Sequence, residues 1–322
     1  MTPQEFRANF DALTTEMSRV VVGYQQVLAD LLMGVFAGGN ILLEAPPGLG
    51  KTLIGKALAA ALGMKQTRIQ FTPDLMPADI VGTNIIVEDE SGKKELVFQP
   101  GPVFTHVLLA DEINRATPKT QSALLEAMQE HHVTVAGKTY TLEEPFLVVA
   151  TQNPEDLEGT YRLPEAQVDR FGFRLRLSNL DDADWIEVVR RRTGTTSIQI
   201  KPVLSRTDVV EMQRAVRQVG VPRPVCAYAS QLVSATHVNG QATLEAVRKY
   251  VRLGCSPRGI QALILGAKVR ALCDGRSEIR IDDIRSVAVP ALGHRMLLNF
   301  EGQADRIETD QIVRGILKEV AA

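Results

Sequence analysis

Residues 45–52, APPGLGKT, have the types and spacing of a loop that binds the phosphates of a nucleotide. Successive backbone N–H groups in such a loop can surround a β-phosphate, and a helix that starts there adds positive potential. Lys51 can bridge the β- and γ-phosphates, and the Thr52 hydroxyl can ligate Mg²⁺. Ala45 stands at the first position, where glycine is usual, so we expect its φ to stay negative. The residues expected to contact the nucleotide here are Pro47, Gly48, Leu49, Gly50, Lys51, Thr52 and Leu53.

Two adjacent carboxylates, Asp111 and Glu112, follow the apolar run 107–110. At the end of a strand beside a phosphate loop, Asp111 can hold Mg²⁺ directly or through water. Glu112, turned toward a γ-phosphate, can polarise an attacking water molecule. Such a pair alone is more often an ordinary acidic loop, and the preceding phosphate loop is what favours the catalytic interpretation.

Asn153 follows another apolar run, 146–150, in the stretch TQNP. An asparagine at a strand end next to the carboxylates can help to orient the attacking water. Taken by itself, an Asn-Pro pair more often marks a turn.

These residues need elements to position them, and the sequence predicts strands that alternate with helices. An apolar run at 40–44 precedes the phosphate loop, and a helix rich in Ala and Leu follows it over 53–62. Further strands are predicted at 68–71, 107–110, 146–150 and, more weakly, 175–177. A helix is predicted over 121–130, with Thr117 as its cap and Pro118 at its first position. The alternation predicts an α/β fold with a parallel sheet and helices on both faces.

Two stretches interrupt this alternation and predict β-hairpins, one over 85–98 around the turn 89–92 and one over 132–142. Residues 1–40 are expected to be helical, with an interruption at 20–23. Beyond a polar loop at 193–205, helices without matching strands are predicted at 206–219, 225–235, 259–271 and 281–292. We therefore expect an α/β core over 1–195 and a smaller helical domain over 205–322.

Several longer motifs resemble the MoxR family of AAA+ ATPases, in order along nearly the whole chain. They are 71–82 (FTPDLMPADIVG), 101–104 (GPVF), 108–116 (LLADEINRA), 119–130 (KTQSALLEAMQE), 150–154 (ATQNP), 163–171 (LPEAQVDRF), 256–259 (SPRG) and 290–295 (PALGHR). This resemblance implies a P-loop AAA+ core with hairpin insertions, followed by an all-helical lid domain. Arg162 stands where proline is common in the family, a departure from which we expect little effect.

The resemblance also implies roles for single residues. Asn153 corresponds to the residue called sensor 1, and Arg170 to the arginine finger that reaches a nucleotide held by the neighbouring subunit. Arg258 corresponds to sensor 2, which the lid would carry onto a nucleotide bound between core and lid. The stretch Val21, Val22 and Gly23 corresponds to the segment that packs round adenine. No mechanism suggests itself for His294 and Arg295, although both belong to the family pattern.

A MoxR-type ATPase is expected to hydrolyse Mg-ATP in a ring, here a hexamer. The family commonly acts with proteins that carry von Willebrand factor A domains, so such a partner is implied, with a client that the sequence does not name. The hairpin insertions would line or cap the central pore of the ring.

Composition agrees with such a protein and weighs against some rivals. In 322 residues, 36 Lys+Arg against 38 Asp+Glu leave a net charge of −2, without the strongly basic balance of proteins that coat nucleic acid. Three widely spaced cysteines and the absence of a signal-like or membrane-spanning stretch predict a reduced, cytoplasmic protein.

Three other functions stay open at this point. A magnesium-chelatase-like motor subunit shares the same insertions, but the LADEINRA run favours MoxR. A DNA-dependent motor is expected to carry a zinc cluster, or a GAFTGA loop with a helix-turn-helix, and the sequence has neither. A non-enzymatic scaffold has only Ala45 in its support.

Overall fold

Five strands form the predicted parallel sheet, in the spatial order β2-β5-β8-β1-β9. They are β1 (Ile41–Glu44), β2 (Gln66–Gln70), β5 (Val107–Asp111), β8 (Leu147–Gln152) and β9 (Phe173–Arg176). Every neighbouring pair is parallel. The carboxyl ends of β1, β5 and β8 therefore meet at one edge of the sheet, which is where the phosphate loop, the carboxylates and Asn153 follow.

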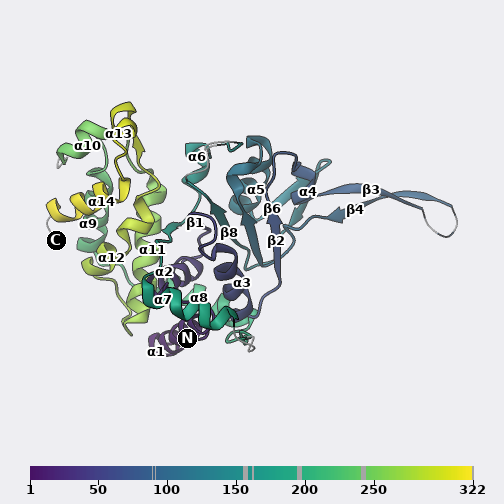
Figure 1. Ribbon diagram of the computed structural model, residues 1–322, viewed down its shortest axis with the longest axis horizontal. Helices are drawn as coiled ribbons and strands as arrows, with labels where there is room; N and C mark the ends of the chain where they lie inside the picture. The colour runs from purple at the N-terminus through teal and green to yellow at the C-terminus, as the bar shows by residue number, and fades with distance from the viewer. Residues whose placement is uncertain are drawn as a thin grey trace.

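The computed structural model describes residues 1–88, 90, 92–154, 159–161, 163–193, 198–240 and 244–320. Asp89 and Ser91 of the predicted hairpin turn lie outside the described residues, as does Arg162. Figure 1 shows the sheet in the middle of the molecule, with the C-terminal helices on one side and a long hairpin on the other.

Both faces of the sheet are buried, because alternate residues of each strand point to opposite sides. Leu43 and Leu109 belong to a cluster of buried side chains that includes helices α1 (Pro3–Ser18), α2 (Gln25–Phe36) and α3 (Lys51–Ala61). Leu42 and Leu108 belong to a second cluster, which includes α5 (Pro118–Glu130). The prediction of helices on both faces is thus confirmed.

Local signals explain most of the helix starts in the core. Thr2 and Glu5 form a capping box at the start of α1. Thr117 occupies the position before α5 as predicted, but within the described helix its hydroxyl contacts Thr120 Oγ1 at 3.2 Å rather than a backbone N–H. Two short helices, α4 (Pro77–Val81) and α6 (Glu165–Val168), and a 3-10 turn, η1 (Ile113–Arg115), complete this part of the core.

One core helix, α7 (Asp182–Thr193), was not among the predicted elements. It begins where Asp181 Oδ1 accepts a hydrogen bond of 2.8 Å from the Asp184 N–H, a side-chain cap that was visible in the sequence. Helix α7 lies next to the N-terminal segment, since Arg191 donates to the Ser18 carbonyl at 3.2 Å.

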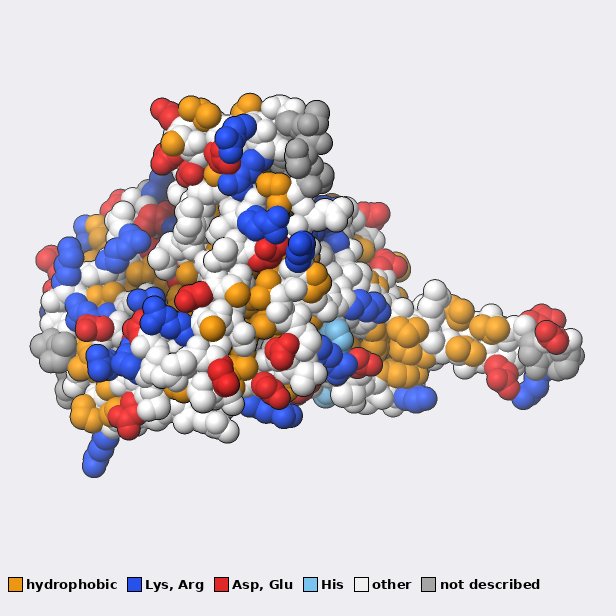
Figure 2. Space-filling model, turned by 90° about the horizontal axis from the view of Figure 1, so that it is seen from below, with side chains coloured by type: hydrophobic (Ala, Val, Ile, Leu, Met, Phe, Trp, Pro, Cys, Tyr) orange, Lys and Arg blue, Asp and Glu red, His pale blue; other side chains and the backbone are white. Residues whose placement is uncertain are grey.

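Both predicted hairpins are present: β3 (Gly82–Glu88) with β4 (Lys94–Pro100), and β6 (His132–Val135) with β7 (Lys138–Thr141). The β3–β4 hairpin projects far from the body of the protein (Figure 1). Ile86 and Leu96 face each other across this hairpin and are 68% and 73% exposed. Figure 2 shows apolar side chains along the projecting arm.

The C-terminal part is helical apart from one short antiparallel pair of strands, β10 (Val251–Leu253) and β11 (Leu297–Leu298), which the prediction of an all-helical lid did not include. Its helices are α8 (Arg206–Gln218), α9 (Arg223–Ser234), α10 (Glu245–Tyr250), α11 (Pro257–Cys273), α12 (Ile281–Leu292), α13 (Phe300–Ala304) and α14 (Thr309–Glu319). Helix α12 packs against the edge strand β9, and α11 against α1 and α2. Within the described ranges, no helix combines the length and apolar character needed to cross a bilayer.

Gly55 sets how closely α3 approaches the sheet, because a Cβ at this position would overlap the buried Leu109 side chain on β5. We predict that Gly55→Ala lowers the free energy of unfolding by about 1 kcal/mol. Overpacking costs about 1–3 kcal/mol, and the better helix propensity of alanine returns up to about 1 kcal/mol. Urea denaturation of Gly55→Ala and of the wild type measures the difference in the free energy of unfolding.

The control is the same substitution in a Leu109→Ala background, where the space is vacant. There, Gly55→Ala should leave the free energy of unfolding unchanged or raise it. An equal loss in both backgrounds would show that the contact with Leu109 is not the cause.

Candidate nucleotide-binding site

The phosphate loop connects the end of β1 to the start of α3. Gly48 and Gly50 have φ angles of 89° and 82°, a backbone region that other residues adopt rarely. Ala45 is buried and is not among the residues with positive φ, so alanine fits at the first loop position without strain. The Lys51 ammonium donates to the Ala45 carbonyl and, at 3.3 Å, to the Pro46 carbonyl. The side chain thus lies within the curve of the loop.

Asp111 and Thr52 are in direct contact, as their predicted shared role requires. The Thr52 hydroxyl donates to Asp111 Oδ2 at 3.0 Å, and the Thr151 hydroxyl donates to Oδ1 at 3.0 Å. Arg68 on β2 also donates to Oδ2, at 2.6 Å. Arg68 and Thr151 were not among the predicted site residues, although Arg68 lies on β2 and Thr151 on β8, the two strands that pair with β5.

Glu112 lies at the sharp turn between β5 and η1, with φ 56° and ψ 50°. This left-handed conformation is uncommon for a residue with a side chain and is typical of functional sites. The Thr151 hydroxyl holds the turn by accepting from the Glu112 N–H at 2.9 Å. The carboxylate itself accepts from Gln70 at 2.9 Å and lies 3.2 Å from Arg115 Nε.

Asn153 comes directly after β8, which lies between β5 and β1. Its side chain is buried, 5% exposed, and its carbonyl accepts from Asn114 at 3.3 Å. The preceding residue, Gln152, accepts from Lys51 through its carbonyl at 3.5 Å. The structure therefore brings the phosphate loop, Thr52, both carboxylates and Asn153 to one edge of the sheet.

A cavity of about 150 Å³ adjoins the loop on the side of the N-terminal segment and α7. Its lining is mostly apolar: Val20, Val21, Val22, Tyr24, Gly48, Leu49, Gly50, Leu53, Ile54, Leu180, Trp185, Val188 and Arg191. Val22 and Leu53, both predicted to contact the nucleotide, are part of it. Gly23 does not line the cavity; it has φ 79°, and a Cβ there would overlap Leu180 and Asp184.

The sequence analysis missed Trp185 and Val188, which line this cavity from α7. Their spacing of three residues, after the cap at Asp181, is a helical signal that could have revealed them. Among the described residues, none from the C-terminal helices lines the cavity. In this chain α7, rather than the lid, closes the cavity beside the loop, and the expected nucleotide site between core and lid stays a prediction.

Arg170 and Arg258 lie elsewhere. Both line a second cavity, of about 260 Å³, together with Gly39 and Asn40, which precede β1. The phosphate loop follows the other end of β1, four residues or roughly 13 Å away. Arg258 pairs with Asp169 at 3.1 Å, next to Arg170. Arg258 thus lies away from the phosphate loop of its own chain, on a lid that packs against β9, and its expected role toward a nucleotide stays a prediction.

The residues at the loop fit Mg²⁺ by the chemistry of their donors. Thr52 and Asp111 present a hydroxyl and a carboxylate oxygen 3.0 Å apart, and hard oxygen ligands are what Mg²⁺ prefers. Within the described part of the chain no cluster of three or more His, Cys, Asp or Glu side chains could hold a metal alone. A site of this kind takes the remaining ligands from water and substrate phosphates.

A P-loop at the carboxyl edge of a five-stranded parallel sheet, with paired carboxylates and a helical C-terminal part, defines an AAA-type ATPase. Sequence comparison agrees: a profile of the ATPase family associated with various cellular activities (AAA) matches residues 40–173, and a profile of the AAA lid domain matches 243–316. A crystal structure of a proposed ATPase from Cytophaga hutchinsonii superimposes with a TM-score of 0.90. It is 41% identical and covers 99% of this chain and 96% of its own.

Among curated relatives, "Chaperone MoxR1" of Mycobacterium tuberculosis is 40% identical over 95% of this chain and 80% of its own length. "Protein MoxR" of Methylorubrum extorquens is 30% identical over 95% of this chain and 93% of its own. The chain belongs to the MoxR family of AAA ATPases.

Trp185 is the sole tryptophan of the chain and lines the cavity beside the loop with 43% of its surface exposed. We predict that ATP or ADP changes its fluorescence on binding, because the nucleotide displaces water from the indole. Lys51→Ala should weaken binding about 10- to 100-fold, the effect of losing a hydrogen bond from a charged group. Fluorescence titration measures both.

Trp185→Phe serves as the control, since it removes the signal while calorimetry still detects binding. A nucleotide that binds by calorimetry and leaves the emission of Trp185 unchanged would place the base outside this cavity.

Proposed function

We propose that this protein hydrolyses Mg-ATP in a ring, expected to be a hexamer, and uses the reaction to remodel or activate partner proteins. In this proposal Lys51 and the loop amides hold the phosphates, and Val22, Gly23 and the apolar cavity receive the base. Thr52 and Asp111 hold Mg²⁺, which supplies charge neutralisation on the phosphates when bound. Glu112 orients a water molecule and accepts its proton, and Asn153 helps to position that water.

One observation carries the ring: the phosphate loop and Arg170 lie at opposite ends of β1. An arginine that stabilises the transferred phosphoryl group accelerates hydrolysis by about 10³–10⁵-fold, but only when it reaches the γ-phosphate. Since Arg170 lines the cavity at the other end of β1 from its own loop, the arrangement supports a site completed by the next subunit. Arg258 lines the same cavity as Arg170, so we assign it to that neighbouring site as well.

The partner is inferred from the family and from the projecting hairpin. A relative of this chain bears the name "Chaperone MoxR1", and the resemblance to MoxR proteins suggests a partner with a von Willebrand factor A domain. Ile86 and Leu96 on the β3–β4 hairpin are exposed apolar side chains of the kind that contact other proteins. A magnesium-chelatase-like role or a DNA-dependent role is left as an outcome of the experiments below.

Subunit mixing tests the shared site. Lys51→Ala removes a subunit's own catalysis and keeps its Arg170, whereas Arg170→Ala does the reverse. We predict that each variant alone has little ATPase activity and that an equimolar mixture regains activity. About a quarter of the interfaces in a random ring then pair an intact loop with an intact finger. A mixture no more active than its components would contradict the shared site.

Partner capture tests the function. Glu112→Gln keeps the shape of the side chain but cannot accept the proton of water, so the ATP-bound state should persist. We predict ATP-dependent recovery of a protein with a von Willebrand factor A domain from native lysate. Lys51→Ala is the matched control, because it prevents that state from forming. Recovery of DNA-binding factors or porphyrin enzymes, or the same proteins with and without ATP, would refute the MoxR-type function.

A further inference from the structure

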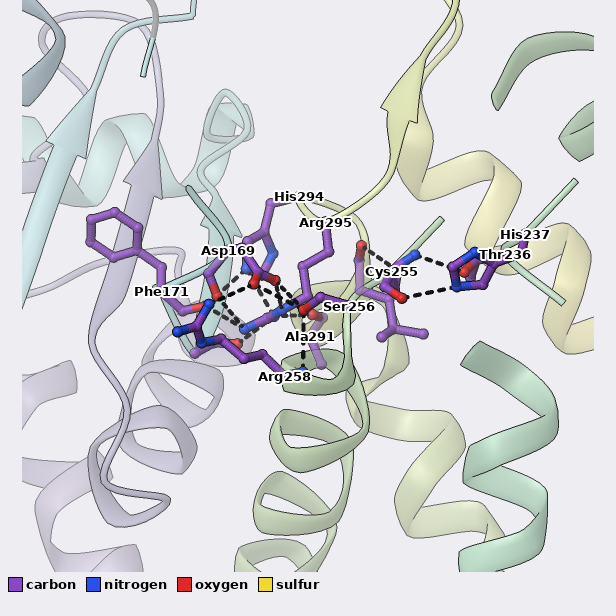
Figure 3. Close-up of polar contacts among 12 residues, drawn as sticks. Asp169, Phe171, Thr236, His237, Cys255, Ser256, Arg258, Ala291, His294 and Arg295 are labelled. Atoms are coloured by element: carbon purple, nitrogen blue, oxygen red, sulfur yellow. Dashed lines mark hydrogen bonds and ion pairs between the residues drawn. The ribbon is translucent and has the colours of Figure 1, made fainter. Parts of the chain in front are cut away.

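Asp169, directly before Arg170, receives three donors from the lid. The Ser256 hydroxyl donates to its carboxylate at 2.7 Å, and Arg258 donates to it at 3.1 Å. Arg295 Nε donates to Oδ1 at 3.1 Å. Figure 3 shows these side chains converging on Asp169 from the lid. The carboxylate therefore ties the segment between α6 and β9 to two separate parts of the lid.

Arg295 also holds the backbone on both sides of Arg170. It donates to the carbonyl of Asp169 at 3.2 Å, of Phe171 at 2.7 Å and of Gly172 at 3.1 Å. A further bond goes to the carbonyl of Ala291 in α12, the helix that ends three residues before Arg295. The five N–H groups of the guanidinium thus all have acceptors, a set that the three N–H groups of a lysine cannot match.

Arg295 is almost fully buried, and the charged groups that face it are Asp169 and Arg258, the second cation on the same carboxylate. The Arg295 side chain is 2% exposed. His294 lies against it, with Nε2 2.9 Å from Arg295 Nη1 and 2.9 Å from the Phe171 carbonyl. Burial, reinforced by the charge of Arg295, holds the pKa of His294 well below its usual value. This low pKa keeps the imidazole neutral, so the cations that pair with Asp169 are Arg295 and Arg258.

Among the described residues, the Arg170 side chain has one hydrogen-bond partner, the Leu125 carbonyl, to which Nη1 donates at 3.2 Å. Its Nε is buried, and among the residues that the structure describes no acceptor lies within hydrogen-bond distance of it. The position of the Arg170 side chain thus depends on its backbone, and that backbone is fixed by Arg295.

We propose that Arg295 is a positioning residue for Arg170: by clamping the carbonyls of residues 169, 171 and 172 and the carboxylate of Asp169, it makes the docked lid the support of the finger. Arg295 touches no nucleotide in its own subunit. Its effect appears in the hydrolysis rate of the neighbouring subunit. This inference rests on the proposed function, in which Arg170 acts on the neighbour's nucleotide.

The test uses Arg295→Lys, which keeps the charge but loses the fork of donors. We expect kcat to fall about 10- to 100-fold, the effect of misplacing a catalytic group by about 1 Å. Nucleotide affinity, followed through Trp185, should stay within about 2-fold of wild type, since binding uses the subunit's own loop. Mixing with Lys51→Ala subunits should restore activity, because their intact fingers serve the intact loops of the Arg295→Lys subunits.

Two further variants keep the outcome clear. Asp169→Asn retains the shape and the bond from Ser256 but loses the charge pairs with Arg258 and Arg295. It should lower kcat as Arg295→Lys does, and it provides a second test if Arg295→Lys folds poorly. Arg285→Lys is the matched control, because Arg285 ties lid elements to one another through Tyr228 at 2.9 Å and Leu317 at 2.8 Å. It should leave kcat within about 2-fold of wild type.

The outcomes separate the two proposals. Failure of the Lys51→Ala and Arg170→Ala mixture to regain activity would refute the shared site itself. If that mixture is active, either of two results would overturn the positioning role. One is a wild-type kcat in Arg295→Lys, and the other is a mixture of Arg295→Lys with Lys51→Ala that stays inactive. An inactive mixture of Arg295→Lys with Lys51→Ala would mean that Arg295 supports the fold of its own subunit rather than catalysis in the neighbour.

Discussion

Strand β1 is the constraint on which the rest of the site depends. At its carboxyl end the chain turns into the phosphate loop, and residues at its amino end line the cavity that contains Arg170 and Arg258. A paired strand inside a sheet is rigid along its length, so the loop at one end of β1 and the cavity at the other end stay separated by the length of the strand, roughly 13 Å. This separation within one chain is the reason for proposing that the loop and the arginines of one site come from different copies of the chain.

The two adjacent carboxylates show how one edge of a sheet separates two roles. Asp111 ends β5 and is 4% exposed, with donors from Thr52, Thr151 and Arg68. Glu112, one residue later, lies on a left-handed turn with its carboxylate partly exposed. Such different surroundings suit a fixed ligand and a group that exchanges a proton with water. Thr151 supports both, since it donates to Asp111 and accepts from Glu112.

The sequence predicted what local patterns determine. The strands, both hairpins and the loop-to-helix transition at Lys51 follow from periodicity and turn residues, and parallel register then brought Asp111 and Asn153 beside the loop. The docking of the lid could not be predicted, because it depends on which face of α12 packs against β9. The sequence therefore did not show that Arg258 lies away from the loop of its own chain, and α7, which lines the cavity, was not predicted. The motif residues His294 and Arg295 gained an interpretation only once Asp169 was found beside them.

Burying Arg295 has an energetic reason beyond stability. Removing a guanidinium from water costs several kcal/mol, and a buried ion pair often contributes less than apolar residues of the same volume. Apolar packing, however, is tolerant of small shifts, whereas five directed hydrogen bonds admit one backbone geometry. An arginine finger loses most of its effect when displaced by about 1 Å. A buried guanidinium that binds three carbonyls around Arg170 is therefore better suited to fixing a backbone position than to adding stability, and in the proposed shared site the accuracy required of Arg170 explains this cost.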